Sequence, residues 1–211
     1  MLSLSALSMP AASQALDAAA GTAASAAAQA ALALTDPDNP VRGAREQAIA
    51  RTADLLNNIR ARLDACGEHG MLAQHQQAAA VVEEASNTPA IAAEANRRPP
   101  LQWNARLANA AADHARAMAE QQFFAHRDPK GHTVGHRVSV TGYRWQQVGE
   151  NLAAGHETIE DAVRGWLLST THCEVIIDET FTEFGIARMP SANPADPYRT
   201  YWALVVAQPR R

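Results

Sequence analysis

The sequence is short of aromatic residues, cysteines and long apolar runs, and each shortage excludes a class of protein. The 211 residues are 5% aromatic but 47% hydrophobic, which still allows a packed core and argues against wholesale disorder. Two cysteines are too few for a disulfide scaffold or a cysteine-rich metal site. No stretch offers the roughly 18 uninterrupted apolar residues that a membrane span requires. These limits predict a soluble protein with one main domain.

Basic residues are also in the minority. Lys and Arg together number 18 against 22 Asp and Glu, which gives a formal net charge of -4. Proteins that bind nucleic acids normally carry a basic stripe, so nucleic acid is not an expected partner. Cys66 and Cys173 are able to form one disulfide or to remain two buried thiols, and composition does not choose between them.

Residues 1–40 resemble an export signal followed by an Ala-rich arm. Ala, Ser, Leu and Thr dominate, and the helix-breaking Pro10 precedes Ser13-Gln14-Ala15, as at the end of a secretory signal. No basic residue precedes Arg42, so the basic start of such a signal is missing. The alternative is a low-complexity arm that frays in solution.

The first helix is predicted over residues 43–64, where apolar residues recur at helical spacing. The arginines of this segment, including Arg60, fall away from that apolar stripe. A second, weakly amphipathic helix is predicted over residues 71–85, which are rich in Gln and Ala. The stripe of the first helix consists of Ile49, Leu55, Leu56, Ile59 and Leu63.

The second half of the chain carries clearer signals for helices and strands. Asn104 is a good N-cap for the residues that follow it. Thr158 and Asp161 form a capping-box pattern that opens another helix. The segments predicted are a helix over 105–121, an ordered loop over 126–143, a helix from 159, and strands over 184–189 and 200–207.

A series of short motifs follows in this half, and any one of them alone is a weak signal. They are Leu101-Gln102-Trp103-Asn104, Phe124-Ala125-His126, Gly149-Glu150-Asn151-Leu152-Ala153, Ser169-Thr170-Thr171-His172, Phe184-Gly185-Ile186-Ala187 and Tyr201-Trp202. Their order and spacing over residues 99–208 resemble the CAP superfamily, which includes cysteine-rich secretory, antigen 5, pathogenesis-related and bacterial SCP-like proteins.

The resemblance implies an α+β fold, the CAP-type α-β-α sandwich with a small antiparallel sheet between helical layers. Residues 41–67 would then form the first helix of the CAP domain and residues 99–211 its core, with 1–40 preceding it. Residues 68–98 depart from the family pattern, in which the Leu-x-Trp segment soon follows the first helix. We interpret them as a helical insertion whose role the sequence does not reveal.

The resemblance also implies a disulfide. Some family members end the first helix with Cys-Gly and carry a second Cys directly after the His of the Ser-x-x-His segment. Cys66-Gly67 and His172-Cys173 match that variant. A Cys66–Cys173 bridge is therefore expected.

By the same resemblance, His126, Glu150 and His172 line a central cleft. Imidazole and carboxylate groups suit Zn²⁺ or another divalent metal, and the same groups are also able to move protons. Ser169 occupies the position of a second acidic residue that many members carry, and it is counted with the cleft. Glu150 has an equally good interpretation as an internal acceptor that caps loop amides.

Other candidate residues have simpler interpretations. His114 is expected to be a partly buried core residue, and Arg137 to tie down its loop rather than touch a ligand. Trp145 is expected at the cleft rim, partly exposed. His132 and His136 resemble a metal-binding His pair, but the Glu of a zincin motif is absent. No Gly-x-Ser-x-Gly nucleophile elbow occurs.

The function expected from the resemblance is that of a secreted or periplasmic binding module, in monomeric form. Its partner would be a small ligand, a lipid or a component of the cell envelope. The resemblance implies no common catalytic activity. One alternative is a metal-assisted hydrolase of peptide or cell-wall material with Glu150 as the base, and another is a structural module with a vestigial cleft.

Overall fold

The computed structural model describes residues 40–62, 66, 71–87 and 98–211. The chain divides into two compact units, residues 1–48 and 49–211, and the sheet and its covering helices belong to the second. The expected export signal and Ala-rich arm lie outside the described residues. None of the described helices is both long and apolar enough to cross a membrane.

A four-stranded sheet forms the middle of the second unit, with strand order β1-β3-β4-β2. β4 pairs antiparallel with both β3 and β2, whereas the two-residue β1 pairs parallel with β3. The expected strands at 184–189 and 200–207 are confirmed, but the sheet is mixed rather than wholly antiparallel because of β1. The strands are β1 (Gln102–Trp103), β2 (Trp145–Ala154), β3 (Glu183–Pro190) and β4 (Thr200–Pro209).

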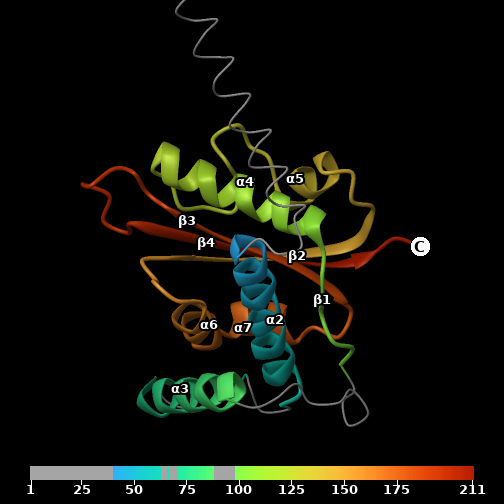
Figure 1. Cartoon of the computed structure of the whole chain (residues 1–211), viewed down its shortest axis with the longest axis vertical. Helices are drawn as coiled ribbons and strands as arrows, with labels where there is room; N and C mark the ends of the chain where they lie inside the picture. Colours follow the sequence, from blue (N-terminus) through green and yellow to red (C-terminus); the bar gives the residue numbers. More distant parts are fainter. Residues whose placement is uncertain (1–39, 63–65, 67–70, 88–97) are drawn as a thin grey trace, which may run out of the picture. The chain divides into compact units, whose positions relative to one another are not determined.

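Helices cover both faces of this sheet, which confirms the α+β sandwich (Figure 1). Side chains alternate along β4, so Trp202 and Leu204 enter one core while Tyr201 and Val205 enter the other. The first core packs against α2 (Pro40–Arg60), α3 (Met71–Asn87), α6 (Ile159–Leu167) and α7 (Thr170–Ile177). The second packs against α4 (Ala105–Gln121) and α5 (Val134–Val140).

The local helix signals of the second half are confirmed. α4 has the predicted bounds, and the Asn104 side chain accepts hydrogen bonds from the amides of Arg106 and Leu107. Thr158 caps α6 by accepting from the amide of Asp161 at 3.1 Å. The ordered loop expected over 126–143 was wrong in part, because it contains α5, whose first turn is capped by Thr133.

α2 differs from the expected first helix at both ends and in one side chain. It ends at Arg60, and its residues Leu55, Leu56 and Ile59 are buried as predicted, while Leu63 lies outside the described residues. Arg60, expected away from the apolar stripe, is only 1% exposed. Its guanidinium donates to the carbonyl oxygens of Pro99, Ile176, Asp178 and Phe181.

The expected disulfide is confirmed between Cys66 and Cys173, whose Cα atoms are 5.8 Å apart. It joins residue 66, which follows α2, to α7, which also carries His172. The bridge therefore constrains the helix that bears His172, one of the histidines expected to line the cleft.

Reduction of this bridge is expected to lower the free energy of unfolding by about 2–4 kcal/mol, because the cross-link closes a long loop in the unfolded chain. The sequence separation is 107 residues. Urea unfolding with and without reductant measures the loss, and a Cys66→Ser, Cys173→Ser variant is the control that should not respond to reductant. An unchanged midpoint for the reduced wild type would contradict the expectation.

Candidate functional site

His126 lies in the loop that follows α4, and the end of that helix sets the path of the loop. Gln122 adopts a left-handed backbone conformation, with φ 56°, which terminates α4. The ring Nε2 of His114 lies 2.9 Å from the carbonyl oxygen of Ala125, the residue just before His126. His114 is 1% exposed, so the expectation of a core residue is confirmed, and it anchors the loop.

Glu150 holds the ring of His126 from the edge strand of the sheet. Its side chain lies on β2 and is 2% exposed, and Oε1 is 2.9 Å from Nδ1 of His126. Arg137 of α5 donates to the other oxygen, Oε2, at 2.6 Å. Both carboxylate oxygens are therefore engaged, and the buried negative charge of Glu150 is paired with the guanidinium of Arg137.

Arg137 performs two tasks, of which the sequence indicated one. Its Nη1 donates to the carbonyl oxygens of His126 and His132, which confirms that it ties down the loop. The ion pair with Glu150 was not anticipated, since the two residues lie 13 positions apart on different elements. Among the residues that the structure describes, the partners of Glu150 are the side chains of His126 and Arg137, and no loop amide donates to it.

His172 approaches from the other helical layer, in the first turn of α7. Its carbonyl oxygen accepts a hydrogen bond of 2.8 Å from Nδ2 of Asn151, a fully buried residue next to Glu150 on β2. Neighbouring residues of a strand point to opposite faces, so Glu150 and Asn151 connect β2 to the two layers. Asn151 is thus a positioning residue for His172 that the sequence analysis quoted only as part of a motif.

The structure brings some of the expected cleft residues into contact and leaves others apart. His126 and Glu150 are in direct contact, and His172 lies near enough for the charge of His126 to act on it. Ser169 is the N-cap residue of α7, and its hydroxyl is 3.2 Å from the hydroxyl of Thr171. Among the described residues Ser169 has no hydrogen bond to the other three.

The pKa values of the two histidines move in opposite directions. The hydrogen bond to Glu150 raises the pKa of His126, whereas burial, and then the charge of His126, lowers the pKa of His172. Because folding raises the pKa of His126, its pairing stabilises the fold below the ordinary value of 6.5. That contribution is lost as the pH rises through the folded pKa.

A divalent metal fits this geometry only in part. Within the described ranges, no group of three His, Cys, Asp or Glu residues is arranged to hold a metal ion. Glu150 already contacts His126 and Arg137 through its two oxygens. The Nε2 of His126 has no hydrogen bond to a described residue, so a metal there would be held by imidazole nitrogens, with Glu150 orienting His126.

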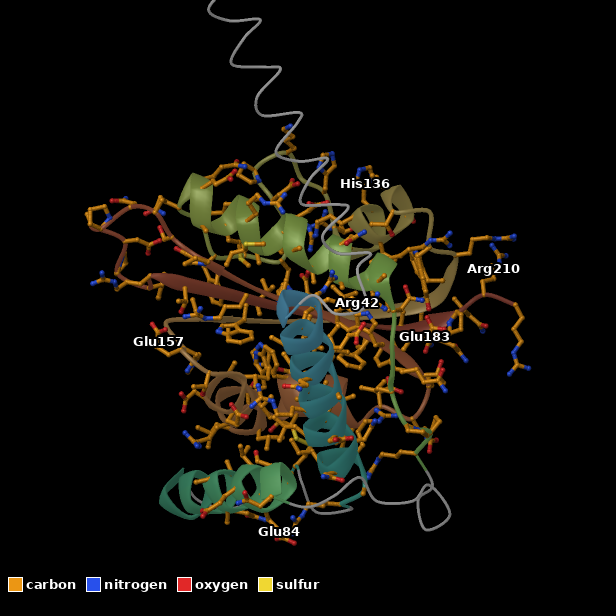
Figure 2. The ribbon with its side chains drawn as sticks, in the orientation of Figure 1. Arg42, Glu84, His136, Glu157, Glu183 and Arg210 are labelled. Carbon is orange, nitrogen blue, oxygen red and sulfur yellow. A yellow bond between two sulfur atoms is a disulfide. The ribbon has the colours of Figure 1, made fainter. Side chains whose placement is uncertain are left out.

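The other histidine pair does not join this site. Nδ1 of His132 is 2.9 Å from Oδ2 of Asp128, and the rings of His132 and His136 are stacked with centroids 4.2 Å apart. His136 is exposed on α5, as Figure 2 shows. This pair has its own acidic partner in Asp128.

Residues 53–206 match the CAP family, described as the cysteine-rich secretory protein family, and the chain belongs to that family. The resemblance inferred from the motifs is therefore confirmed. Among curated proteins, the chain is 28% identical to the uncharacterized protein YkwD of Bacillus subtilis over 94 residues, or 44% of this chain and 37% of that protein. It is 30% identical to the uncharacterized membrane protein YlbC of the same organism over 86 residues, or 41% of this chain and 25% of that protein.

Solved structures of similar proteins include an extracellular protein with an SCP domain from Bacillus anthracis, at 23% identity and a TM-score of 0.46. The match covers 65% of this chain and 41% of that one. Another is an outer surface protein of Borrelia burgdorferi, at 18% identity and a TM-score of 0.47, covering 66% of this chain and 92% of that one.

Proposed function

We propose that this CAP-family chain is an extracytoplasmic binding module that takes up a small ligand or envelope component at His126 and His172. One observation carries the proposal: the His126 side chain is 58% exposed although it is held by a side chain that is 2% exposed. Arg137 already neutralises Glu150, so the fold has no electrostatic need for an exposed imidazole there. An oriented, accessible ring is what ligand binding requires.

The disulfide supports a location outside the cytoplasm. Disulfides persist in oxidising compartments and are rare among cytoplasmic proteins, where thiols are kept reduced. The Cys66–Cys173 bridge joins the region after α2 to α7, which carries His172. A secreted or periplasmic module would retain that constraint, and a cytoplasmic one would lose it.

An exposed aromatic pair next to His126 supports a ligand with an apolar portion. Phe124 and Tyr198 are 45% and 44% exposed, and their ring centroids are 5.8 Å apart. Phe124 precedes His126 by two residues on the same loop. Large apolar side chains that remain accessible beside a polar group are typical of binding sites.

A divalent metal at this site would be held by Nε2 of His126 and the ring of His172, with Glu150 orienting His126 from behind. Such an ion would supply a Lewis acid to a carboxylate, carbonyl or water ligand. The lowered pKa of His172 favours the neutral imidazole that metal binding needs, whereas the raised pKa of His126 makes binding compete with a proton.

The hydrolase alternative, with Glu150 as base, has weaker support. A general base has to reach the proton that it accepts. The Glu150 side chain is 2% exposed, and its two oxygens already face His126 and Arg137 at 2.9 and 2.6 Å. The binding function is therefore the one that the geometry supports best.

Calorimetric titration with Zn²⁺ tests the proposed site. Wild type should bind about one equivalent, and a His126→Ala, His172→Ala variant should lose that binding. The matched control is His132→Ala, His136→Ala, which removes the stacked pair and should bind as wild type does. Equal affinity in the cleft variant and wild type, or no binding to either protein, would overturn the metal-binding form of the proposal.

Organic extraction of protein from its native host tests the ligand itself. Bound material should be recovered from wild type and should be reduced in Phe124→Ala, which leaves the His126–Glu150 contact in place. Thermal unfolding controls for folding of the variant. Extracts without any bound compound from both proteins would count against uptake of an apolar ligand.

A further inference from the structure

A groove lies at the end of the sheet where β2 begins and β4 ends. Its volume is about 1300 Å³. Trp145 and Pro209 are paired across the two strands there, and the amide of Arg210 donates to the carbonyl oxygen of Arg144 at 2.9 Å. Residues on its walls include Tyr143, Arg144, Trp145, Gln208, Arg210 and Arg211.

Three guanidinium groups on these walls have no partner among the described residues. Arg144, Arg210 and Arg211 are exposed, and their side chains form no hydrogen bond or ion pair there. Arg210 projects from the end of β4 in Figure 2, on the side where Glu183 is also labelled. Three positive charges therefore gather at one groove of a chain whose formal net charge is -4.

One wall of the groove is formed by a side chain that hydrogen bonds hold in place. Trp145 is fixed by a hydrogen bond of 3.0 Å from its Nε1 to the hydroxyl of Ser139, which in turn donates to the carbonyl oxygen of Gly135. A Cβ on Gly135 would lie 2.9 Å from the Trp145 ring, so the glycine permits this close packing. The ring is thereby held in one position beside the arginines.

Tyr143 forms the inner wall of the groove. This residue is 6% exposed and lines the groove. Burial, and then a hydrogen bond with the carboxylate of Glu183, raises its pKa, so the hydroxyl keeps its proton. Glu183 also accepts a hydrogen bond from Asn104 at 2.7 Å, so two side chains of the fold hold its carboxylate.

We propose that this groove binds a phosphate-bearing organic ligand, with Arg144, Arg210 and Arg211 contacting the phosphate oxygens and Tyr143 at the groove wall. A phosphate group offers more acceptor oxygens and more charge than one carboxylate, which matches several guanidinium forks. The volume of the groove exceeds that of the phosphate itself and leaves room for the group attached to it.

Two sources of such a phosphate are distinguished by the probes. Inorganic phosphate and glycerol phosphate represent soluble ligands and are titrated by calorimetry at low and physiological salt. Phosphatidylcholine vesicles with and without phosphatidylglycerol represent an anionic lipid headgroup and are tested by co-sedimentation. Saturable binding of either soluble probe supports a free phosphate, and binding only to the anionic vesicles assigns the groove to a headgroup.

Two arginine variants distinguish binding at this groove from a general effect of the net charge of the protein. Arg144→Gln, Arg210→Gln should weaken binding by about tenfold or more, because charge-assisted hydrogen bonds are lost. The control Arg116→Gln, Arg188→Gln removes the same charge from exposed arginines paired with Asp113 and Glu157, and should change affinity less than about twofold. Equal losses in both variants would overturn the proposal, as would wild type that binds none of the probes.

A variant at the His126 site keeps this proposal separate from the proposed cleft function. His126→Ala, His172→Ala should bind the phosphate probes as wild type does, so this proposal and the proposed cleft function fail independently.

Discussion

Replacing Arg60 by methionine is expected to lower the free energy of unfolding by about 3–5 kcal/mol, since buried acceptors would lose their shared donor. The guanidinium donates to four carbonyl oxygens at 2.6–3.1 Å, from the segments around Pro99, Ile176 and Phe181. Those segments lie between 39 and 121 residues away in sequence. One side chain thus holds the end of α7 and the approach to β1 against α2.

The charge of Arg60 is maintained at some cost. Burial, followed by the charge of Arg98, lowers its pKa to about 10. The guanidinium nevertheless remains protonated at neutral pH. The network is therefore a set of charge-assisted hydrogen bonds.

Arg51→Met is the matched control, because Arg51 is exposed on the same helix nine positions earlier. It should change stability by less than about 0.5 kcal/mol. Chemical denaturation of the two variants and wild type gives the comparison. Similar losses for both variants would mean that the buried network around Arg60 contributes little.

Gly185→Ala is expected to destabilise the protein by about 3 kcal/mol or more, because the backbone of α4 lies directly over β3 at this point. An added Cβ would lie 2.0 Å from the amide nitrogen of Ala108 and 2.3 Å from the carbonyl carbon of Leu107. Main-chain atoms of a helix are unable to move aside as a flexible side chain would. The helix would have to separate from the sheet, which would also disturb the loop that carries His126.

Gly43→Ala is the control for this substitution. Gly43 lies in α2, and a Cβ there would meet no atom within 4 Å. Alanine favours a helix over glycine by about 0.5–1 kcal/mol, so stability should rise slightly. If Gly185→Ala unfolded at the wild-type midpoint, α4 and β3 would not be as closely packed as described.

Elements with a local signal were predictable from the sequence. Asn104 and Thr158 correctly predicted the starts of α4 and α6, because a capping side chain accepts hydrogen bonds from amides two or three residues further along the chain. The alternation along β4 likewise follows from the strand itself. The Cys66–Cys173 bridge was predicted from the family resemblance, since composition did not choose between a disulfide and two free thiols.

Features that depend on distant parts of the chain were not predictable. The spacing of Arg137 and Glu150 carries no signal of an ion pair, because only the approach of α5 to β2 brings them together. Arg60 looked like a surface residue since nothing near it in sequence reveals the carbonyl oxygens that receive it. α5 was missed because its seven residues include a glycine and depend on Thr133 and the packing of Trp145.

The central claim is that Glu150, paired with Arg137, orients His126 and raises its pKa, whereas burial lowers the pKa of His172. NMR titration of the histidine ring protons measures this directly in wild type, in Glu150→Gln and in the control Glu120→Gln, which alters an exposed residue of α4. The His126 midpoint should lie above 6.5 and the His172 midpoint below it, and only Glu150→Gln should lower the His126 value. Equal midpoints for the two rings, or a His126 midpoint indifferent to Glu150→Gln, would contradict the account.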